Sequence, residues 1–226
     1  KRIQDVPVLL ASSPPAILEV RGELFMPNSI FEQVNAEREA SGEPLYANSR
    51  NLTAGTLKSL DTGIVAKRKL SFLAHGRGEV DGLVAQGYAA FQEALGALGI
   101  PVSSLRRSTR EIDELVDWIE EFAGERDNLG FGVDGMVVRV DSFAAQERLG
   151  ATSKAPRWCI AFKYPAEQGR TVLERVDWQV GRNGTLTPRA TMTPIELAGS
   201  TVSHATLHNI EEIGRNQGLT TPQVLR

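Results

Sequence analysis

The pattern of the chain changes after Pro165. Before it, strand-like runs alternate with segments in which apolar residues have helical spacing, which indicates helices mixed with strands. From Thr171 onward, short β-branched runs are separated by turn residues, with an Asn-Gly pair at 183–184. Asn-Gly between two such runs is a strong hairpin signal. The sequence therefore predicts two domains, an α+β domain over 1–167 and a small, incomplete β-barrel over 168–226.

Composition excludes several classes of protein. Hydrophobic residues make up 41% and charged residues 23%, as in ordinary soluble globular domains. No apolar run approaches the roughly 20 residues that span a bilayer. The single cysteine, Cys159, excludes an internal disulfide and a cysteine-based zinc site. With no secretion signal at its start, the chain is expected in the cytoplasm.

The expected elements follow from spacing and from capping signals. Ser29 with Glu32, and Ser108 with Glu111, have the spacing of capping boxes and predict the starts of two helices. The three tryptophans are expected in the core. Strands are predicted at 17–25, 70–74, 133–140, 158–164, 172–180, 185–191 and 195–202.

Three strand-like segments each place a charged residue beside apolar residues. They supply carboxylates at Glu23 and Asp134 and an ammonium at Lys163. That set suits a nucleotide, because carboxylates bind ribose hydroxyls or a metal and a cation binds phosphate. Each residue also has a simpler interpretation: an ion pair of Glu23 with Arg21, a turn aspartate before glycine, and a lysine that faces water.

A polar segment at 46–58 is rich in amide, hydroxyl and guanidinium groups, which are donors for phosphate oxygens. It includes Arg50 and Lys58, and its alternative interpretation is a solvated loop. The basic clusters at 66–69 and 106–107 are expected to be exposed faces. The three histidines have no metal-ligand spacing with carboxylates or cysteines, so no metal site is predicted among these residues. With a net charge of −3, binding to nucleic acid depends on such local patches.

With these segments identified, nearly the whole chain resembles the bacterial NAD-dependent DNA ligases. Segments 19–23 (EVRGE), 133–138 (VDGMVV) and 161–165 (AFKYP) are similar to late motifs that these ligases share with ATP-dependent ligases and capping enzymes. Four further stretches are similar to the NAD-dependent branch alone. These are 46–55 (YANSRNLTAG), 155–158 (APRW), 179–188 (QVGRNGTLTP) and 205–209 (ATLHN).

The resemblance implies a fold. The first domain would be a nucleotidyltransferase (ATP-grasp-like ligase) adenylation domain that lacks its N-terminal part, with mixed and antiparallel sheets and helices. The second would be a partial OB-fold. The nucleophilic Lys-x-Asp-Gly motif is absent from the 226 residues. The family's zinc finger, the only part for which Zn²⁺ is implied, is absent too. We therefore expect the chain to be a fragment of a longer ligase.

The resemblance also implies a chemistry. A lysine would attack the α-phosphate of NAD⁺, release nicotinamide mononucleotide and become lysyl-AMP. The AMP would pass to the 5′-phosphate of a nick, and the 3′-hydroxyl would then displace it. Mg²⁺ or Mn²⁺ would assist. By resemblance, Asp134 and Lys163 would be catalytic, and Glu23, Arg139 and Lys163 would bind the cofactor. Arg139 stands where the family usually has lysine.

Arg50, Lys58 and Arg182 would contact DNA by resemblance. The implied partner is nicked double-stranded DNA, in replication and repair, and no membrane is implied. The protein would be a monomer in the cytoplasm, near the nucleoid. Two alternatives stay open. One is an ATP-dependent nucleotidyltransferase, for which only the shared motifs argue. The other is a non-catalytic DNA-binding remnant, for which the missing nucleophile argues.

Overall fold

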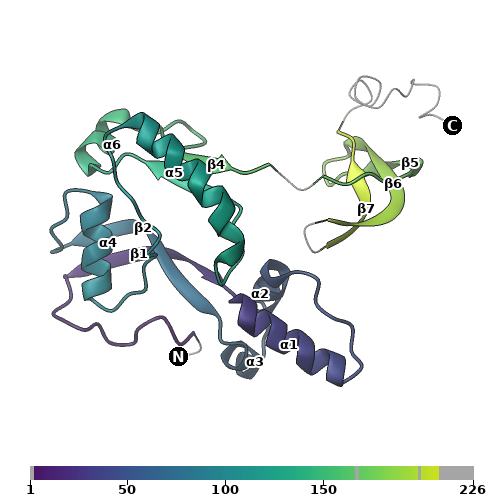
Figure 1. The fold of residues 1–226 in the computed structure, drawn as a ribbon, viewed down its shortest axis with the longest axis horizontal. Helices are drawn as coiled ribbons and strands as arrows, with labels where there is room; N and C mark the ends of the chain where they lie inside the picture. Colours follow the sequence, from purple (N-terminus) through teal and green to yellow (C-terminus); the bar gives the residue numbers. More distant parts are fainter. Residues whose placement is uncertain (1–2, 166–167, 198–199, 209–226) are drawn as a thin grey trace. The chain divides into compact units, whose positions relative to one another are not determined.

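The structure, a computed structural model, describes residues 3–165, 168–197 and 200–208. The chain divides into two compact units, Lys1–Tyr164 and Pro165–Arg226, both drawn in Figure 1. The first unit combines helices with two-stranded antiparallel sheets, and the second contains a three-stranded antiparallel sheet. The predicted α+β fold class is therefore confirmed.

Helices and strands are mixed along the first unit, and the elements in the described residues of the second unit are all strands. In the first unit β1 pairs with β2, and β3 pairs with β4. The elements are β1 (Ile17–Phe25), α1 (Asn28–Ala40), α2 (Ser49–Leu57), α3 (Thr62–Lys67), β2 (Ser71–Asp81), α4 (Tyr88–Ala97), α5 (Ile112–Glu125), the 3₁₀ turn η1 (Arg126–Asn128), β3 (Gly135–Arg139), α6 (Phe143–Leu149), β4 (Cys159–Lys163), β5 (Leu173–Val180), β6 (Leu186–Leu197) and β7 (Ser200–Thr206).

Two apolar clusters hold the first unit together. One packs α4 and the start of α6 against β2, and the other packs α2 beside the end of β1 and the start of β2. Figure 1 accordingly shows α4 beside one end of the β1–β2 ribbon and α1 to α3 at the other. The buried members are Ala74, Phe91, Leu95, Ile100 and Phe143 in the first cluster, and Met26, Leu52 and Leu70 in the second. Burying one large apolar side chain contributes about 1.5–3 kcal/mol, so these contacts hold the helices on the ribbon.

The β1–β2 ribbon contains an irregularity near its middle. Arg21 pairs with Gly76, whereas the next residue on β1, Gly22, pairs with Ala74. His75 is therefore an extra residue on β2, which is a β-bulge. Such a residue stays outside the regular ladder, so its backbone groups can bind a partner from another element.

Both predicted capping boxes are wrong, although both helices form. α1 starts one residue before Ser29, and its N-cap is Pro27, without a side-chain cap. α5 starts after Glu111, whose backbone N–H donates to the hydroxyl of Thr109 at 3.0 Å. The Ser-x-x-Glu spacing can therefore occur beside a helix start without forming the cap. The cap depends on backbone dihedral angles that the spacing does not report.

The second unit forms the predicted hairpin. Gly184 has a φ of +77°, and the Gly181 N–H donates to the Thr185 carbonyl at 2.8 Å. The next two predicted strands are not separate as expected: β6 is one strand through Leu197, with irregular pairing after Thr191. Within residues 168–197 and 200–208 the three strands form an open sheet and not a closed barrel, which agrees with the expected incomplete barrel.

The prediction that all three tryptophans lie in the core is wrong. Trp178 on β5 is 41% exposed, and Trp118 and Trp158 are only half-buried. β5 belongs to a sheet that the described residues leave open, so part of its apolar face stays uncovered.

Candidate functional site

Asp134 and Lys163 lie at the same end of the β3–β4 sheet. Gly135 pairs with Lys163 in the antiparallel register, and the Tyr164 N–H donates to the Asp134 carbonyl at 3.4 Å. Both charged side chains are exposed. At one end of paired strands, an ammonium can bind a phosphate group and a carboxylate can bind the cation that accompanies it.

Gly135 allows the two strands to approach at this end. A Cβ atom on residue 135 would lie 2.1 Å from the carbonyl oxygen of Phe162 and 2.9 Å from the Cα of Lys163. Backbone atoms cannot give way as the end of a flexible side chain can. The glycine after Asp134 is therefore required by the pairing of β3 with β4, and the simpler interpretation of Asp-Gly as a turn is wrong here.

Arg50 reaches this site from α2. The side chain of Asn48 caps the helix by accepting from the N–H groups of Arg50 and Asn51 at 2.8 and 3.1 Å. Arg50 thus stands in the first turn, and its Nη1 lies 3.2 Å from Oδ2 of Asp134. The two side chains are 79% and 71% exposed, and an exposed pair of this kind contributes about 0–1 kcal/mol. Both groups can therefore exchange this partner for a ligand at little cost.

The Arg21 side chain pairs with Glu19 and not with Glu23. Its Nη2 lies 3.2 Å from Oε1 of Glu19, and the Glu79 N–H donates to the other oxygen at 3.2 Å. The backbone hydrogen bond from Glu79, and then Arg21, lower the pKa of the Glu19 carboxyl below its usual value. The alternative in which Arg21 neutralises Glu23 is therefore wrong, and the exposed Glu23 carboxylate can serve a ligand.

The loop before Asp134 is held against the end of β1. The rings of Phe25 and Phe131 have centroids 4.8 Å apart, and the Asn28 N–H donates to the Gly130 carbonyl at 2.8 Å. Side chains two residues apart on a strand share a face, so Glu23 lies on the same face of β1 as Phe25. β1 and β3 are thus linked close to both carboxylates. No hydrogen bond joins Glu23 to Asp134 or Lys163 within the described ranges, and their meeting around one ligand stays a prediction.

Arg139 and the two other predicted contacts occupy different places. Arg139 ends β3, and its guanidinium contacts β2 and α4, where the His75 carbonyl accepts a hydrogen bond from Nη1 at 3.2 Å. Its contact with the nucleotide stays a prediction. Lys58 is exposed directly after α2. Arg182 is exposed in the turn between β5 and β6, in the second unit.

Sequence reasoning missed a polar cluster that fixes α2, defined by Tyr46, Thr56 and Arg68. Arg68 Nη1 donates to the buried Thr56 hydroxyl at 2.7 Å, and its Nη2 donates to the Tyr46 hydroxyl at 3.0 Å. Arg68 belongs to the basic run 66–69, which was predicted to be an exposed face, and this prediction is wrong for Arg68, which is half-buried. No local pattern distinguishes it from its two lysine neighbours, because its partners are 12 and 22 residues away.

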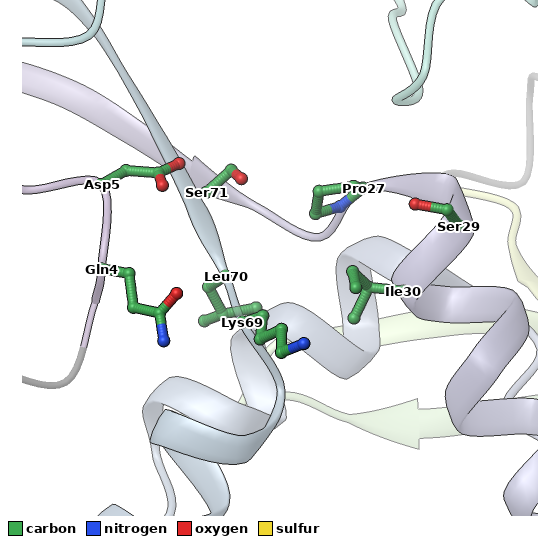
Figure 2. Close-up of a pocket in the computed structure, with 8 residues that line it drawn as sticks. All are labelled: Gln4, Asp5, Pro27, Ser29, Ile30, Lys69, Leu70 and Ser71. Carbon is green, nitrogen blue, oxygen red and sulfur yellow. The ribbon is translucent and has the colours of Figure 1, made fainter.

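A pocket of about 280 Å³ lies beside the start of α1 and the start of β2. Figure 2 shows Gln4 and Asp5 on one side of it and Pro27, Ser29 and Ile30 on the other. None of the predicted site residues lines this pocket. Its polar groups are already engaged in part, since the Asp5 carboxylate accepts from the Phe72 N–H at 3.3 Å.

The described part of the chain contains neither a metal-binding cluster nor a membrane-spanning helix. No group of three or more histidine, cysteine, aspartate or glutamate residues is placed there to hold a metal ion. No helix among the residues placed by the structure is long and apolar enough to cross a membrane.

Comparison with known families gives two matches, one for each part of the chain. The family model of the NAD-dependent DNA ligase adenylation domain matches residues 1–167. The family model of the NAD-dependent DNA ligase OB-fold domain matches residues 170–224. The first match includes Asp134, Lys163 and Arg50, and the second includes Arg182.

Curated relatives agree with these matches. A DNA ligase of Geobacter sulfurreducens is 43% identical over 216 residues, which is 95% of this chain and 32% of that protein. A DNA ligase of Brevibacillus brevis is 44% identical over 219 residues, 97% of this chain and 32% of the relative. A DNA ligase of Akkermansia muciniphila is 46% identical over 225 residues, 95% of this chain and 27% of the relative. The chain spans about a third of the length of the curated relatives it matches.

Proposed function

This chain belongs to the family of NAD-dependent DNA ligases, and we propose from that premise that it handles the adenylate and the DNA in an enzyme that seals nicks. Residues 1–167 would be the adenylation part and 168–226 the OB-fold part. The observation that carries the proposal is the position of Asp134, Lys163 and Arg50. They lie at one end of the β3–β4 sheet, inside the segment that matches the adenylation domain.

The proposed roles follow from charge. Negative charge develops on the non-bridging oxygens of a phosphate during transfer, and a preorganised cation stabilises it. Lys163 would supply that cation. Glu23 would accept hydrogen bonds from the ribose hydroxyls of the adenylate. Asp134 would hold a metal ion or a proton beside the same phosphate.

A divalent cation fits the donor set at Asp134. Mg²⁺ is usually held by one or two carboxylates together with waters and substrate phosphates, so one exposed carboxylate is enough. Asp134 is 71% exposed and only weakly engaged by Arg50. When bound, the ion would supply Lewis-acid polarisation of the phosphate oxygens. The protein residues would orient that phosphate and balance its charge.

DNA contacts would come from both units. Arg50 and Lys58 stand at the two ends of α2, and Arg182 stands at the β5–β6 turn. Because the Arg50–Asp134 pair is weak, a DNA phosphate can replace the carboxylate as the partner of Arg50. The substrate would be nicked duplex DNA in replication and repair. The ligase would act as a monomer in the cytoplasm, near the nucleoid.

The match to the NAD-dependent family supports NAD⁺ rather than ATP as the donor of the adenylate. The alternative of a non-catalytic remnant rests on the absence of a Lys-x-Asp-Gly motif from the 226 residues. The relatives are about three times longer, and a nucleophile elsewhere in the longer protein would remove that argument. The donor can be tested directly by comparing labelled NAD⁺ with labelled ATP.

The central experiment measures enzyme–AMP formation from labelled NAD⁺ in the full-length ligase. We expect Lys163→Ala to lower the rate by about 10²–10³-fold, the loss typical of a missing charge-stabilising group. The matched control is Lys154→Ala, because Lys154 is another exposed lysine of this unit. Adenylation of the Lys163 variant at the unchanged rate would remove Lys163 from the mechanism. Labelling from ATP but not from NAD⁺ would overturn the choice of donor.

A further inference from the structure

The side chain of Arg139 makes two contacts with other elements. Nη1 donates to the backbone carbonyl of His75 at 3.2 Å. The guanidinium also stacks over the ring of Tyr88, with Cζ 3.9 Å from the ring centroid. Arg139 is half-buried, whereas His75 and its hydrogen bond to Arg139 are exposed. A stack of this kind contributes about 0.5–2 kcal/mol, more as it is desolvated.

The carbonyl that Arg139 uses comes from the β-bulge of β2. His75 is the extra residue between the pairs Arg21–Gly76 and Gly22–Ala74. Two residues away on β2, Leu73 pairs with Glu23. Arg139 therefore links β3, which follows Asp134, to the strand that pairs with the one bearing Glu23.

Tyr88 is itself held firmly at the start of α4. Its N–H donates to the Asp141 carbonyl at 2.9 Å, and the next N–H, of Ala89, donates to Oδ1 of Asp141 at 2.7 Å. Gly87 permits this approach, because a Cβ there would lie 2.2 Å from Oδ2 of Asp141. The backbone of Tyr88 is thus held in place by hydrogen bonds to Asp141. The Tyr88 ring and the His75 carbonyl together define the place of the guanidinium.

Contacts on both sides of β3 attach it to the β1–β2 ribbon and to α4, which packs on that ribbon. Before β3, the contacts of Phe131 with Phe25 and of Gly130 with Asn28 hold the preceding loop to the end of β1. At the last residue of β3, Arg139 holds the strand to the bulge. The hydrogen bonds of Asp141 and the packing of Phe143 add to this attachment just after β3. Attachment on both sides restricts rotation of one sheet against the other.

We propose that Arg139 is a positioning residue that sets the distance between Glu23 and the Asp134–Lys163 pair by clamping β3 to the His75 bulge and to Tyr88. The inference rests on the proposed function for its effect on adenylation. Arginine is required because its planar guanidinium stacks on an aromatic face while donating in its own plane, whereas a lysine ammonium is a compact, strongly hydrated point charge. This role differs from direct contact with the nucleotide, in which the lysine usual in the family would serve as well or better.

The clamp is tested first without catalysis, on the 226-residue chain. Hydrogen exchange of the β3 and β4 amides is measured for Arg139→Lys, Tyr88→Leu, the double variant and Tyr88→Phe. We expect about fivefold to tenfold faster exchange for the first two, in line with the loss of a stack and a hydrogen bond. The double variant is expected to match the worse single variant, since coupled contacts are not additive. Tyr88→Phe keeps the ring and is expected to exchange like the parent chain.

The second measurement is adenylation in the full-length ligase with Arg139→Lys, Tyr88→Leu and Tyr88→Phe. We expect kcat to fall about tenfold for the first two, because small misplacements of reacting groups cost rate. KM for NAD⁺ is expected to stay within about twofold, because the clamp does not touch the nucleotide. Tyr88→Phe keeps the ring and is expected to retain the kcat of the parent ligase. Arg148→Lys, at an exposed arginine of α6, is the matched control.

The two measurements separate the possible failures. If Arg139→Lys leaves exchange unchanged, the clamp does not exist, whatever the enzyme does. If exchange rises but kcat is unchanged, Arg139 is structural and its positioning role is overturned. A rise in KM for NAD⁺ limited to the Arg139 variant, with Tyr88→Leu silent, would assign Arg139 to the nucleotide instead. If the parent ligase itself does not adenylate, the proposed function fails, and the exchange data still decide on the clamp.

Discussion

At the residue scale, the site depends on one position where only glycine fits. Gly135 lies opposite Lys163, and the close approach of the Phe162 carbonyl leaves no room for a Cβ atom. Such a position constrains chemistry indirectly, because the pairing that it allows places Asp134 and Lys163 at one end of the sheet. Glycine here is a requirement of packing and not of backbone angle.

We expect Gly135→Ala to lower the free energy of unfolding by about 1–3 kcal/mol, the typical cost of overpacking. Urea denaturation of the chain measures this change. The matched control is Gly132→Ala, because a Cβ at Gly132 would meet no atom within 4 Å. A neighbouring alanine without a clash is expected to change the free energy by less than about 1 kcal/mol. Equal effects of the two substitutions would contradict the clash.

A second residue-scale prediction concerns Asp177 on β5. The hydrogen bond from Arg175, aided by the Thr191 hydroxyl and the charge of Arg189, holds the pKa of the Asp177 carboxyl below its usual value. A carboxyl whose pKa is lower in the folded state than in the unfolded state stabilises the fold above its unfolded pKa. This contribution is lost as the pH falls through the folded pKa.

The parent chain should therefore be more stable than Asp177→Asn near neutral pH, and the difference should shrink as the pH falls below about 4. Melting temperatures of the two proteins across that range measure the effect. A difference that stays constant from neutral to acid pH would show that the Asp177 carboxylate is not the group responsible.

At the element scale, α2 is fixed by its polar cluster as much as by its apolar face. Thr56 is fully buried, donates to the Leu52 carbonyl at 2.7 Å and accepts from Arg68. The Tyr46 hydroxyl accepts from Arg68, and Arg38 stacks on the Tyr46 ring with Cζ 4.4 Å from its centroid. These contacts tie α1, α2 and the segment after α3 into one body. The cluster therefore fixes the position of α2, the helix that carries Arg50.

We expect Tyr46→Phe to lower the free energy of unfolding by about 1.5–3 kcal/mol, because the charged Arg68 loses an acceptor. Thr56→Val removes the other acceptor and should cost a similar amount. The two changes share one guanidinium, so their combination is expected to cost less than the sum. Urea denaturation of the three variants gives the coupling. Strict additivity would mean that the cluster does not act as a unit.

Helix starts show the limit of short patterns at this scale. Apolar spacing predicted α1, α4 and α5, because a buried face constrains many residues at once. The capping boxes failed because a cap depends on the dihedral angles of one residue. α4 gives a further example, since Asp141, 52 residues further along the chain, caps it through the Ala89 N–H. No local pattern could reveal that partner.

At the scale of the whole molecule, the chain has a net charge of −3, while the proposed partner of both units, DNA, is a polyanion. Attraction to DNA therefore depends on a few local cations. In the proposed function Arg50 contributes from the first unit and Arg182 from the second. The proposal that both units contact the same duplex can be tested through the salt dependence of binding.

We expect Arg50→Ala and Arg182→Ala each to reduce the slope of log affinity against log salt by about 0.9, the value for one phosphate contact. The double variant should lose about twice as much, because each phosphate contact releases its own counterions. Fluorescence anisotropy with a nicked duplex measures the slopes. The control is Arg106→Ala, which changes an exposed arginine in the loop before α5. A full effect of one variant and none of the other would mean that only one unit binds the duplex.

The sequence by itself determined the fold class, the antiparallel hairpin at 183–184 and the ordered motifs that carry the family resemblance. These follow from the alternation of apolar residues, from turn chemistry and from residues within a few positions of each other. The comparisons support the ligase family on the same segments. Local rules sufficed here because each signal depends on residues close together in the sequence.

Only the tertiary structure decided which charged groups meet. Arg21 pairs with Glu19 instead of Glu23, Arg50 meets Asp134 from 84 residues away, and Arg139 binds the carbonyl of the His75 bulge. Each of these partners depends on a strand register or on how two elements pack. An ion pair or hydrogen bond needs atoms within about 3–4 Å, and distances between remote segments are set by packing that no local spacing encodes.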